Sequence, residues 1–138
     1  MKFDKFTLKA QEAMATSQQK AMAQSHTILS PLHLLYALLE DNQGMPTLIL
    51  NKIGSNPDRI RQMAESEMNR LPKGKTGGQM ILPDSAFQQI ILDAQNRADK
   101  MGDEYLSTEH FFLSLSDIPS DAKEILSVNS ITASQIEK

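Results

Sequence analysis

The chain contains an internal duplication, and this duplication restricts its possible folds more than any other feature of the sequence. The segment 28–35 (ILSPLHLL) matches the segment 105–112 (YLSTEHFF) at an offset of 77 residues. From residue 8 to residue 38 the same ungapped offset gives seven identities in 31 pairs: Gln11/Gln88, Gln18/Gln95, Ala21/Ala98, Leu29/Leu106, Ser30/Ser107, His33/His110 and Leu38/Leu115. The register continues with one residue dropped, so that Ile60 pairs with Ile136. The chain is therefore interpreted as two copies of one structural unit.

Each copy opens with apolar residues at spacings of three and four, which predicts a long amphipathic helix. These positions are Ala10, Ala13, Met14, Ser17 and Ala21 in the first copy, and Phe87, Ile90, Ile91, Ala94, Ala98 and Met101 in the second. Thr7 and Asp84 precede the two helices, where a side-chain oxygen can accept from an unpaired backbone N–H. A second helix is predicted after Ser30 and after Ser107, and it is apolar on almost every side. We expect both second helices to be central and buried.

Two shorter helices complete each copy, from about Pro46 to Gly54, Pro57 to Leu71, Asp121 to Val128, and Thr132 onwards. No alternating apolar pattern predicts a strand. The prediction is an all-α fold with eight helices in two pseudo-symmetric four-helix repeats, forming one domain over residues 1–138. Repeat one covers about residues 6–71 and repeat two about 84–138. The Gly and Pro residues between 72 and 83 predict a flexible connector.

Composition excludes several classes of protein. The 138 residues are 40% apolar and 22% charged, as expected for a globular domain, and the net charge of −3 comes without a basic block. A nucleic-acid partner is therefore not expected. The chain has no cysteine, which excludes disulfides and thiolate chemistry. No apolar run approaches membrane-spanning length, so we expect a cytoplasmic protein with no membrane partner.

No catalytic, cofactor or metal site is predicted. Gly74-Lys75-Thr76 resembles the end of a phosphate-binding loop, but Asn69 stands where that loop needs its first glycine, and a helix precedes it rather than a strand. Nucleotide binding by this segment is therefore the least favoured hypothesis. Ser30 and Ser107 are interpreted as helix caps rather than nucleophiles.

The three histidines lack the spacing of a metal site. His33 and His110 are repeat equivalents at the third position of their helices, so a packed and hydrogen-bonded role is expected for both. His26 is expected in a loop.

A binding module is the remaining interpretation. The eight methionines suit a surface that accepts varied apolar partners, but core packing is the preferred explanation for most of them. Leu92 lies off the apolar stripe of its helix, so it is a candidate residue for lining an exposed groove.

The sequence resembles the N-terminal domains of Clp ATPases. The opening residues Phe6-Thr7 and 9–13 (KAQEA), the segment 31–35 (PLHLL) and the segment 102–110 (GDEYLSTEH) are similar to motifs of this family. The segment 69–72 (NRLP), the Gly-Gly connector and the restart at 83–85 (PDS) resemble the ClpB branch in particular. The resemblance covers nearly the whole chain, with its motifs in order.

The resemblance implies a substrate-binding domain that precedes two ATPase modules in an ATP-dependent disaggregase. The parent protein would use ATP and magnesium, form a homohexameric ring, thread unfolded or aggregated polypeptide and work with the DnaK chaperone system. A polar trio tied to substrate handling in ClpB relatives maps onto Thr7, Asp103 and Glu109. His110 stands where relatives can carry an apolar residue, which interrupts an apolar groove there. The alternative is a domain that docks an adaptor of a Clp protease, as in the ClpA and ClpC types.

Overall fold

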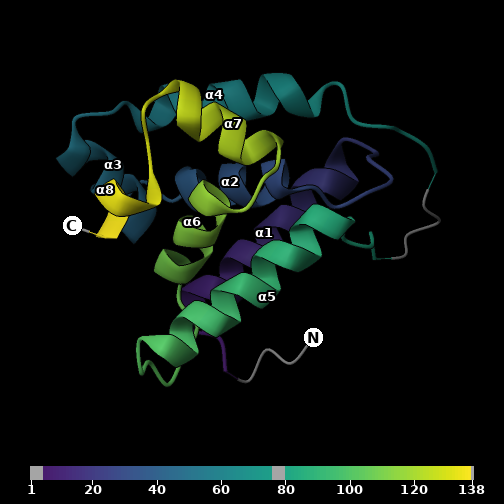
Figure 1. Ribbon diagram of the computed structural model, residues 1–138. Helices are drawn as coiled ribbons and strands as arrows, with labels where there is room; N and C mark the ends of the chain where they lie inside the picture. Colours follow the sequence, from purple (N-terminus) through teal and green to yellow (C-terminus); the bar gives the residue numbers. More distant parts are fainter. Residues whose placement is uncertain (1–4, 76–79, 138) are drawn as a thin grey trace.

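The computed structural model describes residues 5–75 and 80–137, and the described chain is helical with no sheet (Figure 1). Repeat one contains α1 (Leu8–Ala23), α2 (Pro31–Glu40), α3 (Met45–Ile53) and α4 (Pro57–Met68), and repeat two contains α5 (Ser85–Lys100), α6 (Thr108–Asp117), α7 (Asp121–Val128) and α8 (Ala133–Glu137). The predicted all-α class and the predicted order of eight helices are confirmed for these residues.

The two second helices occupy the centre of the molecule, as predicted. Eight of the ten residues of α2 are buried, and α2 packs against α1, α4, α6 and α7. Helix α6 packs in turn against α5, α7 and α8. One apolar core runs through both repeats, and its largest fully buried aromatic side chains are Phe87, Phe111 and Phe112. The helices apolar on all sides are therefore the ones that join the repeats.

The ends of the helices follow the predicted caps closely. The Thr7 hydroxyl accepts from the Ala10 N–H at 3.1 Å, and the Asp84 carboxylate accepts from the Phe87 N–H at 2.8 Å. Helix α4 ends at Met68 rather than Leu71, because residues 69–71 form turn hydrogen bonds instead of continuing the helix. The prediction that Met101 lies on the apolar face of the first helix of repeat two was wrong. Helix α5 ends one residue earlier, so this side chain falls outside the buried stripe and is 58% exposed.

The segment that precedes the first helix of each repeat forms backbone hydrogen bonds with the other repeat. In one direction, residues 5–7 bracket Leu106, with hydrogen bonds from the Thr7 N–H to the Leu106 carbonyl (2.9 Å) and from the Leu106 N–H to the Lys5 carbonyl (2.8 Å). In the other direction, residues 82–84 bracket Leu29 with bonds of 2.9 and 3.0 Å in the same pattern. Leu29 and Leu106 are repeat equivalents, so the pseudo-two-fold relation extends to the backbone.

The predicted flexible connector lies partly outside the described residues, at 76–79. Its described parts are tied to repeat one. The Thr27 N–H donates to the Pro72 carbonyl at 3.0 Å, and the Gly74 N–H donates to the Ser25 carbonyl at 2.9 Å. At the C-terminal end of the connector, the Gln18 side chain of α1 makes two hydrogen bonds to the backbone of Ile81.

Candidate functional site

The three polar residues singled out in the sequence lie around the start of α6. Thr7 contacts this region through its backbone bond to Leu106, while its hydroxyl caps α1. Glu109 lies in the first turn of α6, where a negative charge suits the positive end of the helix dipole. Asp103 lies in the turn just before α6. The fold therefore brings the N-terminus of α1 beside the segment 103–109.

Asp103 forms a hydrogen bond with His110, the residue that stands where relatives can carry an apolar side chain. The Nδ1 atom of His110 accepts from the Ser107 N–H at 2.9 Å, which leaves Nε2 to donate to the Asp103 carboxylate at 2.8 Å. His110 is buried, whereas the Asp103 side chain is 45% exposed. Asp103 thus holds the ring that caps α6 and still presents its carboxylate to solvent.

In repeat one, His33 accepts from the backbone at the start of α2 in the same way, but the partner of its other ring nitrogen is His26. His33 Nδ1 accepts from the Ser30 N–H at 2.9 Å, and its Nε2 lies 2.8 Å from His26 Nδ1. The packed roles expected for His33 and His110 are confirmed. His26 does lie in a loop, but it is fully buried, which the sequence analysis missed. The 77-residue offset pairs His26 with Asp103, so it indicates a shared role as partner of the helix-capping histidine but not the burial of His26.

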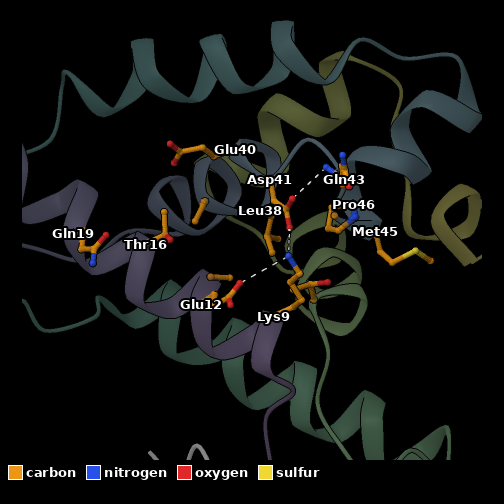
Figure 2. Close-up of a pocket in the computed structure, with 14 residues that line it drawn as sticks. Lys9, Glu12, Thr16, Gln19, Leu38, Glu40, Asp41, Gln43, Met45 and Pro46 are labelled. Carbon is orange, nitrogen blue, oxygen red and sulfur yellow. Dashed lines mark hydrogen bonds and ion pairs between the residues drawn. The ribbon is translucent and has the colours of Figure 1, made fainter.

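A cleft of about 490 Å³, the α1–α2 cleft, lies between α1 and the end of α2. Figure 2 shows Lys9 and Glu12 on α1 facing Asp41, with Met45 at one end and Gln19 towards the other. Lys9 donates to Asp41 at 3.0 Å and lies 3.9 Å from Glu12. The hydrogen bond from Lys9 holds the pKa of the Asp41 carboxyl below its usual value. The cleft is thus a polar trough whose central lysine is already paired.

A second cleft of about 550 Å³, the α3–α8 cleft, adjoins the first through their shared residue Met45. Met45 and Leu48 are 46% and 49% exposed, and they are the most accessible apolar side chains of α3. Glu109 lines this cleft from α6, whereas Thr108 lines the α1–α2 cleft. The remaining lining residues are Ile49, Lys52, Ile53, Gln135, Ile136 and Glu137. The start of α6 therefore lies between a polar trough and an apolar one.

The border of the two clefts is acidic. Its charged side chains are the acids Glu12, Glu40, Asp41, Glu109 and Glu137 and the bases Lys9 and Lys52. Within residues 5–75 and 80–137, no three His, Asp or Glu side chains gather as a possible metal site. In the same residues, no helix has the length and hydropathy needed to cross a bilayer.

In repeat two, the positions corresponding to the α1–α2 cleft bond to one another. Arg97 donates to Asp93 at 2.7 Å and also pairs with Asp117, while the Ser114 hydroxyl donates to Asp93 at 2.7 Å. This network crosses from α5 to α6 over the equivalent surface. The duplication has therefore diverged, with a lined cleft in one copy and a charge network in the other.

One candidate residue of the sequence analysis, Leu92, and the described part of one candidate segment, Gly74-Lys75, line neither of these clefts. Leu92 projects from α5 and is 60% exposed. Gly74 and Lys75 follow α4 in the connector, where the Gly74 N–H already donates to the Ser25 carbonyl rather than facing a phosphate. Thr76 lies outside the described residues. The sequence analysis did not single out Met45 and Leu48, and the only available signal was the apolar start of a short helix.

Comparison with known proteins gives a consistent family. The Clp repeat (R) N-terminal domain family matches residues 5–129. Chaperone protein ClpB of Propionibacterium freudenreichii subsp. shermanii is 31% identical over 140 residues, covering 100% of this chain and 16% of the relative. Chaperone protein ClpB of Rhodopirellula baltica is 33% identical over 128 residues, covering 92% of this chain and 14% of the relative. The chain thus spans about one sixth of the length of these relatives.

Solved structures share the fold at low sequence identity. The Hsp104 N-terminal domain from Candida albicans superposes with a TM-score of 0.83 at 19% identity, covering 97% of this chain and 87% of the other. The ClpV N-domain in complex with a VipB peptide superposes with a TM-score of 0.78 at 15% identity, covering 97% and 83%. These likenesses establish the shared fold.

Proposed function

Because the chain belongs to the Clp repeat N-terminal domain family, we propose that it is the substrate-binding domain of a ClpB-type disaggregase. In this role it captures exposed apolar segments of unfolded or aggregated polypeptide for the downstream ATPase ring. The parent protein would be a cytoplasmic homohexamer that uses ATP and magnesium and cooperates with the DnaK system. This domain would contribute binding rather than hydrolysis.

The α3–α8 cleft is the observation that carries this proposal. An unfolded chain offers apolar side chains to any accessible apolar surface, and Met45 and Leu48 provide one on a rigid helix. Methionine adapts its shape to different partners, as a binder of varied sequences requires. The VipB peptide held by the ClpV N-domain supports peptide binding by this fold.

Thr7, Asp103 and Glu109 are proposed as the polar border of this surface. Glu109 lines the α3–α8 cleft directly, whereas Thr7 and Asp103 hold the two helix starts beside it. The acidic border would favour segments whose apolar residues are flanked by lysine or arginine. Leu92 would belong to a separate apolar contact on α5.

An NMR titration tests the proposal. The ¹⁵N-labelled chain would be titrated with a reduced, carboxymethylated protein that cannot fold, and we expect saturable shifts at Met45, Leu48 and their neighbours. Leu48→Gln should weaken binding about fivefold, because it removes roughly 1 kcal/mol of apolar contact. Met22→Gln is the matched control, since Met22 is 43% exposed on α1 and lines neither cleft.

Two results would contradict the proposal. One is an absence of shifts on α3 at millimolar ligand, and the other is an equal loss of affinity in the Leu48 and Met22 variants. Binding of a folded adaptor with no binding of the unfolded protein would favour the role in a Clp protease instead.

A further inference from the structure

A third cleft, the α4–α7 cleft, has a volume of about 420 Å³ and is built like the α3–α8 cleft. In both places the third helix of one repeat packs against the fourth helix of the other, α7 against α4 and α3 against α8 (Figure 1). The third helices line the two clefts at equivalent positions, which pair, once one residue is dropped, as Met45/Asp121, Leu48/Glu124, Ile49/Ile125 and Lys52/Val128. The pseudo-two-fold relation therefore gives the domain two related clefts.

The opposite walls of the two clefts differ, because α4 is longer than α8. The offset pairs Glu137, the last residue of α8, with Arg61, and α4 continues beyond that point. The end of α4 and the turn after it line the α4–α7 cleft with Met63, Ser66, Glu67 and Arg70. Asn129 joins this wall to α7, since its Nδ2 atom donates to the Ile125 carbonyl at 2.7 Å and to Met63 Sδ at 3.4 Å. The end of α7 is thus held against α4.

The α4–α7 cleft offers apolar contact to a ligand. Val128, the last residue of α7, is 71% exposed, while Met63 is half-buried and Ile125 is packed in the core. Val128 stands where α3 carries Lys52. The position that presents an ammonium group to one cleft therefore presents an aliphatic side chain to the other.

The first turn of α7 reverses this difference. Asp121 and Glu124 stand where α3 carries its two most accessible apolar side chains. Both acids are exposed, and among residues 5–75 and 80–137 neither has an ion-pair partner. The only base that lines the cleft, Arg70, lies 3.9 Å from the third acid, Glu67. The cleft therefore presents an uncompensated negative charge beside its apolar side chains.

We propose that the α4–α7 cleft binds a segment of substrate polypeptide in which lysine or arginine alternates with aliphatic residues. The aliphatic side chains would pack on Val128 and its apolar neighbours, and the cations would pair with Asp121 and Glu124. Acidic segments would be repelled by the same carboxylates. The inference rests on the proposed role in capturing unfolded protein, and it adds a second site that selects by charge.

Two related clefts of different chemistry suit the capture of long unfolded chains. Each cleft is small, and a flexible segment must be ordered to occupy it, so modest affinity is expected for a short peptide. A long chain can place one segment in each cleft, and the second contact is then intramolecular.

Two peptides that differ only in charge test the selectivity. They are acetylated and amidated hexapeptides of sequence KLVKLV and ELVELV, titrated separately into the ¹⁵N-labelled chain. The basic peptide should cause saturable shifts of the Glu124 and Val128 amides, and the acidic peptide should not do so at the same concentration. High salt should weaken binding of the basic peptide.

Variants of the two kinds of contact separate charge from apolar packing. Glu124→Gln should weaken binding of the basic peptide about threefold, because an exposed ion pair is lost. Val128→Gln should weaken it about fivefold through lost apolar contact. Glu124→Lys leaves two acids and two bases in the lining, so the preference between the two peptides should disappear.

Glu104→Gln is the matched control, because Glu104 is an exposed acid that lines none of the three clefts. The inference is overturned if the basic peptide moves no α4 or α7 signals at millimolar concentration, if the acidic peptide moves them equally, or if the Glu104 and Glu124 variants bind with equal affinity. It is also overturned if those signals change on simple dilution, since a second copy would then occupy the cleft. Shifts on α3 without shifts on α4 or α7 would refute this inference alone and leave the proposed function intact.

Discussion

At the residue scale, left-handed backbone conformations mark equivalent turns in the two copies. Ser25 has φ 57° and its equivalent Gly102 has φ 73°. Gly54 has φ 95°, and Ser130, its equivalent once one residue is dropped, has φ 63°. Each copy therefore carries a glycine at one of these turns and a strained serine at the other, because a Cβ atom disfavours positive φ.

Replacement of Ser25 by glycine should therefore stabilise the protein. Ser25→Gly is expected to raise the free energy of unfolding by roughly 0.5–1 kcal/mol, as relief of strain outweighs the greater freedom of glycine in the unfolded chain. Urea denaturation would measure the change. Ser25→Ala keeps the Cβ atom and should give no such gain, so equal stabilities of the two variants would refute the argument.

The buried histidine pair gives the protein a specific sensitivity to acid. Burial, followed by the nearby His26, lowers the pKa of His33 from 6.5 to about 4. Between these two pH values the unfolded chain binds a proton at this position and the folded chain does not. Stability is therefore complete above pH 6.5 and falls as the pH drops towards 4, by on the order of 3 kcal/mol.

The substitution His33→Gln separates the effect of protonation at this position from the other effects of pH on stability. His33→Gln keeps an acceptor for the Ser30 N–H, as in a capping box, but it cannot take up a proton. The difference in unfolding free energy between the native chain and the variant should shrink or reverse from pH 7 to pH 4.5. A difference that stays constant with pH would show that this pair does not titrate in the way described.

At the scale of helices, each copy starts its first helix with a side-chain cap and a segment held by the other copy. Local sequence predicts the cap, because Thr7 and Asp84 need only reach the third residue after them. It does not predict the exchange of segments, since the partners Leu29 and Leu106 lie in the opposite repeats.

Asp84 offers a test of the cap without a change in the core. Asp84→Ala should lower the free energy of unfolding by about 1 kcal/mol, because the Phe87 N–H loses its acceptor and the helix loses a favourable charge. Ser85→Ala, at the next and exposed position, should change stability by much less. Similar losses in thermal unfolding of both variants would contradict a capping role.

At the scale of the whole molecule, the shared core makes the repeats mutually dependent. Helix α2 contacts both α6 and α7 of the other copy, and the exchanged segments cross between the copies at two points. We therefore expect one cooperative unfolding unit rather than two independent halves.

A cavity in repeat one should destabilise both repeats together. Leu34 is fully buried in α2, and Leu34→Ala is expected to cost about 3 kcal/mol. The chain has two tyrosines, Tyr36 in repeat one and Tyr105 in repeat two, and no tryptophan. Tyr36→Phe and Tyr105→Phe backgrounds would thus report on one repeat each. Urea transitions with different midpoints in the two backgrounds would show that the halves unfold separately.

The duplication could be read from matching segments 77 residues apart. The helix order and most caps could be read from local spacing, because helical periodicity and capping involve residues two to four positions apart. The bond between His26 and His33, the exchange of segments and the meeting of Met45, Glu109 and Glu137 could not be read in this way. These contacts depend on how finished helices dock, and docking depends on the shapes of whole faces rather than on any local pattern. The proposed binding surface lies at such a junction. Its apolar residues Met45 and Leu48 meet Glu109 and Glu137 only in the fold, because these residues come from three different helices.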